Sequence, residues 1–178
     1  MTKELDRVKE LIRVIPDFPV KGIQFQDIVP IFSDPLAVES VISTIVQHLL
    51  ATYGVRGVDV VAGLDARGFL FGPMVAARLG ASFVPIRKKG KLPGETFTAE
   101  YVKEYGVDIF EIQTDSIKPG QQVVVVDDLI ATGGSAKAAG TLVSKAGGKT
   151  LEYVFLVELI ELSGAKALDA PTYSLIKV

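Results

Sequence analysis

The chain has 178 residues, 48% of them hydrophobic and 22% charged, which is typical of a soluble globular protein with one domain spanning 1–178. Its formal net charge of −2 gives no indication of a nucleic-acid partner, and it has no cysteine for a disulfide, a thiolate nucleophile or a thiolate metal site. The charged N-terminus has no signal-peptide pattern and no apolar run approaches the length of a membrane helix, so we expect a cytoplasmic protein without a membrane partner.

The first predicted element is a helix that ends at Pro16. Its apolar residues recur at helical spacing: Leu5, Val8, Leu11, Ile12 and Ile15. Residues 16–32 are then punctuated by proline and glycine but keep apolar side chains, including Phe18 and Phe25. We expect this loop to pack against another surface, with Phe18 in the core.

A second helix is predicted to begin at Asp34-Pro35, an N-cap residue followed by proline at the first helical position. Its apolar face consists of Val38, Val41, Ile42, Ile45, Val46 and Leu49. His48, the only histidine, falls on the polar side of this pattern, where we expect a solvated or capping role and no zinc or haem site.

From residue 58 onward, short apolar runs alternate with helical patterns. We expect strands at 58–62, 82–86, 123–126, 151–159 and 173–178, and helices at 69–79 and 135–145. This alternation predicts a parallel sheet with helices on both faces, and the uninterrupted valine runs indicate burial of both strand faces. In such α/β sheets, ligands bind beyond the carboxyl ends of the strands.

Residues 87–110 interrupt the alternation. The segment begins with a basic run, Arg87 to Lys91, continues through the turn signal Pro93-Gly94 and ends in a polar, mixed stretch. A segment of this length inside a compact domain is usually functional or mobile. A solvated charge run is the alternative interpretation, particularly for Lys89.

The strongest functional signal is the segment 123–135. Its buried strand delivers Asp127 and Asp128 to the ligand edge of the sheet, and Ala131, Thr132, Gly133, Gly134 and Ser135 then turn into a helix. Glycines at a helix start allow a phosphate to approach unpaired N–H groups, whereas two carboxylates suit vicinal hydroxyls or Mg²⁺. The pattern therefore indicates a ribose 5-phosphate site, with a buried strand and a capped helix as the alternative.

This segment resembles the phosphoribosyl-pyrophosphate signature of the type I phosphoribosyltransferases. Four further segments, in order along nearly the whole chain, resemble the adenine-specific branch of that family: 17–28, 62–73, 87–94 and 104–106. The resemblance implies an α/β fold with a central parallel sheet flanked by helices, an N-terminal hood at 1–34 and a mobile catalytic loop at 87–110. It also implies a Mg²⁺-dependent purine salvage enzyme that converts adenine and 5-phosphoribosyl 1-pyrophosphate into AMP and pyrophosphate.

The resemblance also implies the roles of individual residues. Glu104 and Arg67 are expected to be catalytic. Asp127 and Asp128 are expected to hold the ribose diol and, indirectly or through the ligand, the metal. The peptide bond between Asp65 and Ala66 is expected to be cis. The 5-phosphate would contact residues 131–135, the pyrophosphate would contact Asp65, Ala66, Arg67, Arg87, Lys88 and Lys91, and adenine would contact Gln24, Phe25, Gln26, Leu129 and Leu159.

In one respect the sequence departs from the family pattern, because relatives often have arginine where this chain has Gln26. A homodimer is expected from the resemblance alone. In this family a basic residue of the loop can reach the neighbouring subunit's site, and whether Arg87 does so stays open. Two other functions stay open. One is a regulator that binds the ribosyl ligand without catalysis; the other is the same chemistry with guanine, hypoxanthine or xanthine.

Overall fold

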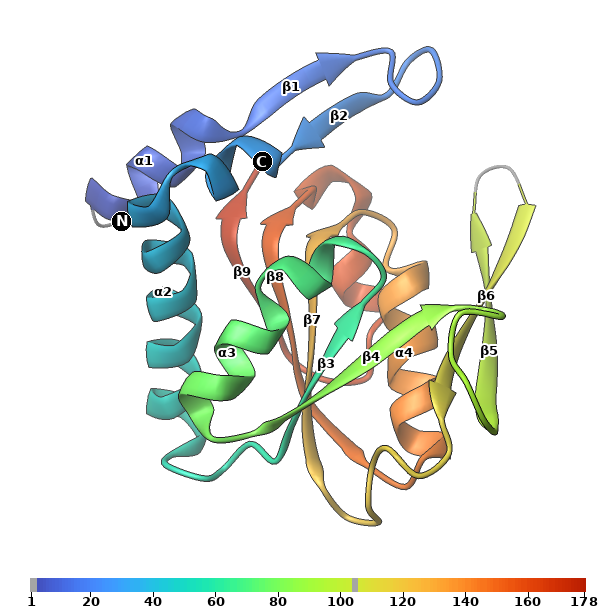
Figure 1. Ribbon diagram of the computed structural model, residues 1–178. Coiled ribbons are helices and arrows are strands. Elements are labelled where there is room, and N and C mark those ends of the chain that lie inside the picture. The colour runs from blue at the N-terminus through green and yellow to red at the C-terminus, as the bar shows by residue number, and fades with distance from the viewer. Residues whose placement is uncertain (1–2, 104–105) are drawn as a thin grey trace. The chain divides into compact units, whose positions relative to one another are not determined.

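The computed structural model describes residues 3–103 and 106–178, with side chains for 5–101 and 107–178. It divides into two compact units, Met1–Ile45 and Val46–Val178. Figure 1 shows the elements of both units. The α/β architecture predicted from the sequence is confirmed, whereas a single domain over 1–178 stays a prediction.

The N-terminal unit contains a helix and a small antiparallel hairpin. Helix α1 (Lys3–Leu11) is followed by strands β1 (Arg13–Pro16) and β2 (Gln24–Asp27), then by the short helix η1 (Val29–Ser33). The predicted first helix therefore ends earlier than Pro16, because the last part of its apolar pattern forms β1. In the hairpin Arg13 lies opposite Asp27, and the two side chains form an ion pair that stabilises this register.

Helix α2 (Pro35–Tyr53) begins where the sequence predicts. The Asp34 carboxylate accepts hydrogen bonds from the N–H groups of Leu36 (3.0 Å) and Ala37 (3.3 Å), which caps the helix start. Of the helices that the structure describes, α2 alone is long and apolar enough to cross a membrane, which corrects our statement that no apolar run approaches that length. It is a core helix, because its apolar face is buried: Val41, Ile42, Ile45 and Leu49.

The second unit is built on a seven-stranded sheet with the order β5-β6-β4-β3-β7-β8-β9. Five neighbouring strands are parallel: β4 (Ser82–Lys88), β3 (Val60–Leu64), β7 (Gln122–Ile130), β8 (Lys149–Glu158) and β9 (Thr172–Lys177). They correspond to the five predicted strands with small shifts at the ends. Every residue of β3 is buried, as expected for a strand covered on both faces.

The chain connections that leave β3 and β7 run toward opposite edges of the sheet. From β3 the chain passes through the short helix η2 (Arg67–Leu70) and α3 (Gly72–Leu79) to β4 on one side. From β7 it passes through α4 (Gly134–Lys145) to β8 on the other side (Figure 1). Right-handed crossovers in opposite directions place α3 and α4 on opposite faces, and they leave a crevice at the carboxyl ends of β3 and β7. The fold thus selects these two strand ends as the candidate site.

The predicted loop excursion contains two strands that the sequence did not indicate. Strand β5 (Thr96–Lys103) and strand β6 (Gly106–Gln113) form an antiparallel hairpin, and β6 joins the sheet through Arg87 and Lys88 of β4. At the end of α4, the Lys145 ammonium group donates to the Thr98 carbonyl oxygen at 2.7 Å. The base of the hairpin is therefore part of the folded unit.

The remaining segments complete the second unit. Short helices η3 (Ile160–Leu162) and η4 (Gly164–Ala167) connect β8 to β9.

The expected solvated or capping role of His48 is wrong. Its ring stacks on Tyr173 with centroids 3.6 Å apart, and its Nε2 lies 2.9 Å from Glu152. Since Glu152 is 4% exposed, His48 serves as the partner of a buried acid.

Candidate active site

Strands β3 and β7 are paired up to Gly63 and Val126, so their carboxyl ends lie side by side. A Cβ atom on Gly68 would lie 2.7 Å from the carbonyl oxygen of Val126, so only glycine lets η2 approach β7 this closely. This approach places Arg67 Nε 2.6 Å from Asp128 Oδ2. The predicted pyrophosphate and ribose segments are therefore brought together, although 60 positions separate Arg67 from Asp127.

The two neighbouring acids of this site are electrostatically coupled. Burial, together with the negative charge of Asp128, raises the pKa of Asp127 well above its ordinary value. Burial also raises the pKa of Asp128, while the positive charge of Arg67 acts in the opposite direction. Asp128 is 3% exposed, and its Oδ2 atom has no aligned hydrogen-bond donor among the described residues despite the nearby guanidinium. The pair therefore suits a ligand that supplies hydroxyl donors or positive charge.

The start of α4 forms the predicted phosphate cradle. Gly133, the N-cap residue, has a φ of 84° and no side chain that could cap the helix, so the first N–H groups are presented to a ligand. The loop is supported from behind by η4. A Cβ atom on Gly164 would lie 2.2 Å from the Ala131 carbonyl oxygen and 2.8 Å from the Gly133 nitrogen. Gly164 is a residue of the site that the sequence did not reveal.

Asp65 and Arg87 extend the site toward β4. The Arg87 Nε atom donates to Asp65 Oδ2 at 3.1 Å, and its Nη1 atom donates to the Lys91 carbonyl oxygen at 3.2 Å. The same guanidinium lies 5.9 Å from the centre of the Phe69 ring. The peptide bond between Asp65 and Ala66 is cis, as the family resemblance implied. Arg87 thus has a defined position beside the turn that follows β3.

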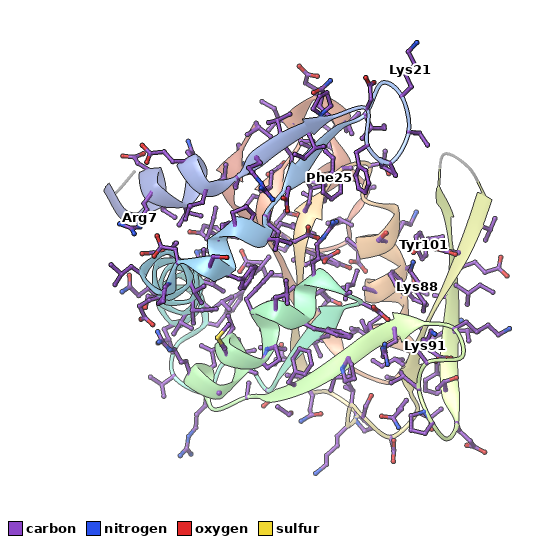
Figure 2. All side chains as sticks on the ribbon, turned by 45° about the horizontal axis from the view of Figure 1, so that its top comes forward. Arg7, Lys21, Phe25, Lys88, Lys91 and Tyr101 are labelled. Atoms are coloured by element: carbon purple, nitrogen blue, oxygen red, sulfur yellow. The ribbon has the colours of Figure 1, made fainter. Side chains whose placement is uncertain are left out.

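The side chains of Lys88 and Tyr101 both lie close to Asp108. The Lys88 ammonium group lies 3.9 Å from Asp108 Oδ2, and the Tyr101 hydroxyl donates to that oxygen at 3.2 Å. Figure 2 shows Lys88, Lys91 and Tyr101 on β4, the turn after it and β5. The basic residues therefore follow β4 and the turn after it, and Lys88 faces an acid of the hairpin.

Two of the predicted adenine contacts lie at the ligand edge of the sheet. Leu129 is near the carboxyl end of β7, and Leu159 directly follows β8. The Leu159 N–H group donates to the Ile130 carbonyl oxygen at 3.0 Å, which continues the pairing of the two strands. Both side chains are partly buried, so they can contribute to the apolar wall of a base pocket.

The other three predicted adenine contacts belong to the N-terminal unit. Gln24, Phe25 and Gln26 are consecutive residues of β2, and the Gln26 amide donates to the Gln24 carbonyl oxygen at 3.4 Å. Phe18 packs edge-on against Phe25 with ring centroids 5.0 Å apart. Because Phe18 is 50% exposed, its predicted place in the core is wrong. The catalytic candidate Glu104 lies outside the described residues.

The chemistry of the carboxylate pair fits magnesium only with help from a substrate. Within the described parts of the chain, no three His, Cys, Asp or Glu residues are grouped so that they could hold a metal ion. Mg²⁺ prefers one or two protein carboxylates together with water and substrate oxygens. Asp127 and Asp128 match this pattern, since the metal would balance charges that burial makes costly.

Comparisons with known proteins agree with this geometry. The phosphoribosyl transferase domain model matches residues 32–178. The chain is 56% identical to the adenine phosphoribosyltransferase of Yarrowia lipolytica over 95% of this chain and 93% of that protein. It is 50% identical to the human adenine phosphoribosyltransferase over 98% of this chain and 97% of that protein.

A crystal structure of the Saccharomyces cerevisiae adenine phosphoribosyltransferase is also similar. That protein is complexed with an imino-altritol bisphosphate and adenine. It superimposes with a TM-score of 0.95 at 46% identity, covering 98% of this chain and 99% of that one. The chain therefore belongs to the phosphoribosyltransferase family, within its adenine phosphoribosyltransferase branch.

Proposed function

We propose that the protein transfers the phosphoribosyl group of 5-phosphoribosyl 1-pyrophosphate to adenine, giving AMP and pyrophosphate. The observation that supports this proposal most directly is the meeting of Arg67 with Asp128 beside the uncapped start of α4. A phosphate cradle, two acids suited to a diol and a guanidinium suited to pyrophosphate are the three parts that this substrate requires.

The reaction forms one bond and breaks one. A ring nitrogen of adenine attacks the anomeric carbon of the ribose while the bond from that carbon to the pyrophosphate oxygen breaks. Pyrophosphate leaves with the bonding electrons, and the proton of the attacking ring is lost. We assign proton transfer at the imidazole ring of adenine to Glu104, on the basis of the family resemblance.

The chain's own residues hold the two ends of the ribosyl substrate. Residues 131–135 bind the 5-phosphate, and this remote binding energy positions the anomeric carbon. Asp127 and Asp128 accept hydrogen bonds from the ribose hydroxyls. Asp65, Ala66, Arg67, Arg87, Lys88 and Lys91 bind the leaving pyrophosphate, and the four cations balance its growing negative charge.

The acids at the end of β7 would also hold Mg²⁺, indirectly or through the bound substrate. When bound, Mg²⁺ supplies positive charge to the pyrophosphate. Its removal by a chelator is expected to abolish turnover, and added Mg²⁺ to restore it.

On the basis of the family resemblance, the choice of adenine is assigned to Gln24, Phe25 and Gln26, and Leu129 and Leu159 are assigned separately as apolar contacts of the base. Phe25 lies against the base, and the main chain around Gln24 and Gln26 recognises its hydrogen-bonding edge. A 6-oxo purine would leave buried polar groups unpaired, which costs about 1–3 kcal/mol per group. We further propose a cytoplasmic homodimer.

One assay tests the proposed reaction against its alternatives. The protein is incubated with Mg²⁺, 5-phosphoribosyl 1-pyrophosphate and labelled adenine, guanine or hypoxanthine. Equal amounts of AMP and pyrophosphate from adenine alone are expected. Product from guanine or hypoxanthine would indicate a 6-oxopurine enzyme, and ligand binding without product would indicate a regulator.

A further inference from the structure

Glu111 is a buried acid of β6 beside the proposed pyrophosphate end of the site. It is 4% exposed. In the sheet it pairs with Arg87 of β4 on one side and with Thr98 of β5 on the other. Acids are rarely buried this completely unless their oxygens have partners. The proposed reaction as described above gives this residue no role.

The partners of Glu111 are in the turn that follows β4. Its Oε1 atom accepts hydrogen bonds from the backbone N–H groups of Lys91 (2.8 Å) and Leu92 (2.7 Å). The Thr96 hydroxyl lies 3.5 Å from Oε2. A carboxylate has only acceptors, so it matches this convergence of donors better than any neutral side chain.

The ionised state of Glu111 is stabilised by the same contacts. Burial alone disfavours its negative charge. The N–H groups of Leu92, Gly90 and Lys91, with the hydroxyl of Thr96, nevertheless lower the pKa of Glu111 below its ordinary value. The negative charge is therefore present throughout the neutral range.

The turn held by Glu111 also holds Arg87. The Lys91 N–H group donates to Glu111, and the carbonyl oxygen of Lys91 accepts a hydrogen bond from the Arg87 guanidinium at 3.2 Å. The other side of that guanidinium donates to Asp65 at 3.1 Å. Arg87 is thus fixed between the turn after β3 and a turn whose shape depends on Glu111.

We propose that Glu111 is a positioning residue for pyrophosphate recognition: it holds the 90–92 turn so that Arg87 and Lys91 are arranged for the leaving group. This proposal rests on the proposed function. Glu111 itself touches neither substrate. Its loss should weaken only those ligands that have a pyrophosphate, because the 5-phosphate cradle on α4 is built from other segments.

Glu111→Gln is the sharpest test, since it keeps the size of the side chain but replaces one acceptor oxygen with a donor. Two charge-assisted hydrogen bonds are weakened, so we expect the KM for 5-phosphoribosyl 1-pyrophosphate to rise about tenfold. The KM for adenine should stay within about twofold. Glu100→Gln, at an exposed glutamate of the same hairpin, is the matched control and should leave both constants unchanged.

Direct binding separates positioning from a general loss of structure. Calorimetry with AMP, which lacks the pyrophosphate, is expected to give the same Kd for wild type and Glu111→Gln. The Kd for 5-phosphoribosyl 1-pyrophosphate with Mg²⁺ should rise about tenfold. Equal weakening of both ligands, or no change in either, would overturn the proposal. If Glu111→Gln does not fold, the same ratio is measured with Glu111→Asp, which keeps the charge.

The binding measurement also separates this proposal from the proposed function. A wild-type protein that binds 5-phosphoribosyl 1-pyrophosphate but makes no AMP from adenine would refute the proposed reaction. The comparison of Glu111→Gln with wild type would still decide the positioning role. A wild-type protein that does not bind this ligand would overturn both.

Discussion

Arg67 Nε lies 2.6 Å from Asp128 Oδ2, which joins the turn after β3 to the end of β7. The pair is asymmetric, because the Arg67 side chain is 39% exposed whereas that of Asp128 is almost fully buried. The exposed guanidinium can therefore turn toward a ligand, while the buried acid needs a replacement for its positive charge. This relationship places a guanidinium that a charged substrate can reach beside an acid whose ionised form burial disfavours.

Replacement of Arg67 should affect catalysis more than folding. In Arg67→Gln the leaving pyrophosphate loses a charge-assisted contact, and kcat/KM for 5-phosphoribosyl 1-pyrophosphate should fall at least about 100-fold. Steady-state kinetics measures this change. Arg78→Gln on α3, an exposed arginine of the same unit, is the control, and an equal loss in both variants would argue against a specific role.

Because Asp127 is a buried acid with a raised pKa, it should make the protein less stable as the pH rises. Its pKa in the folded protein is raised well above the ordinary 3.8, first by burial and then by Asp128. Below pH 3.8 the folded and unfolded forms both hold the proton, so its stabilising contribution is fully present. Above pH 3.8 Asp127 ionises in the unfolded form while it stays protonated in the folded form, so the free energy of unfolding falls as the pH rises. The fall ends once the pH exceeds the raised pKa of Asp127 in the folded protein.

Asp127→Asn should consequently raise the Tm at pH 7 in the presence of a chelator, and the gain should shrink as the pH falls toward 4. Each kcal/mol corresponds to about 2–4 °C in a chain of this size. Calorimetric scans across this pH range measure the difference. Asp115→Asn, at an exposed turn residue, should show no such trend, and a gain independent of pH would contradict the explanation.

The phosphate cradle should require glycine at position 133. A side chain at Gly133 would meet the Gly164 carbonyl oxygen at 2.5 Å, so Gly133→Ala should push the 131–135 loop out of place. AMP and 5-phosphoribosyl 1-pyrophosphate share the 5-phosphate, and both should bind at least about tenfold more weakly.

Gly80→Ala is the matched control for this change. Gly80 also has a positive φ, of 67°, but nothing lies within 4 Å of its added Cβ atom. It should therefore show the backbone cost on stability, about 1 kcal/mol, without the loss of binding. Gly164→Ala should reproduce the binding loss from the other side of the contact.

Glu104 is predicted to act in the chemical step. Glu104→Gln keeps the size of the side chain but removes its ability to accept a proton, so kcat should fall about 100-fold or more with little change in substrate Kd. Rapid-mixing kinetics with both substrates bound isolates this step. Unchanged turnover would remove Glu104 from the mechanism.

Replacement of His48 should lower the stability of the protein without lowering its activity. His48→Phe preserves a ring for the stack on Tyr173 but removes the ring nitrogen beside the buried carboxylate of Glu152, which keeps its contact with the Tyr53 hydroxyl. Urea unfolding should show about 2–4 kcal/mol less stability, since a buried charge that loses a partner is costly. The kcat/KM should stay within about twofold; a large kinetic effect would assign His48 to the site.

Glu152→Gln provides the comparison for this prediction. The amide keeps the shape of the side chain and can still hydrogen-bond to His48, so its cost should be smaller than that of His48→Phe. A larger cost would mean that the negative charge of Glu152 stabilises the protein through another contact.

Local patterns in the sequence predict the parallel core and the main segments of the site. Continuous apolar runs such as 123–126 must be buried on both faces, and glycines beside polar residues at strand ends indicate where a ligand is bound. These are local signals, because a few neighbouring residues specify them. The hairpin strands β5 and β6 were missed although β5 carries a local signal of its own. Phe97, Ala99 and Tyr101 alternate with polar residues, and this period of two is typical of a half-buried strand.

Contacts between groups that are distant in the chain follow from the folded structure and not from local patterns. Arg67 reaches Asp128 because Gly68 permits close approach to β7, Gly164 supports the phosphate loop from a segment beyond β8, and Glu111 holds a turn about 20 residues before it. Such contacts depend on strand order and register, which bring residues together irrespective of their spacing in the chain. The sequence thus specified the chemical groups, and the fold specified which of them act on one another.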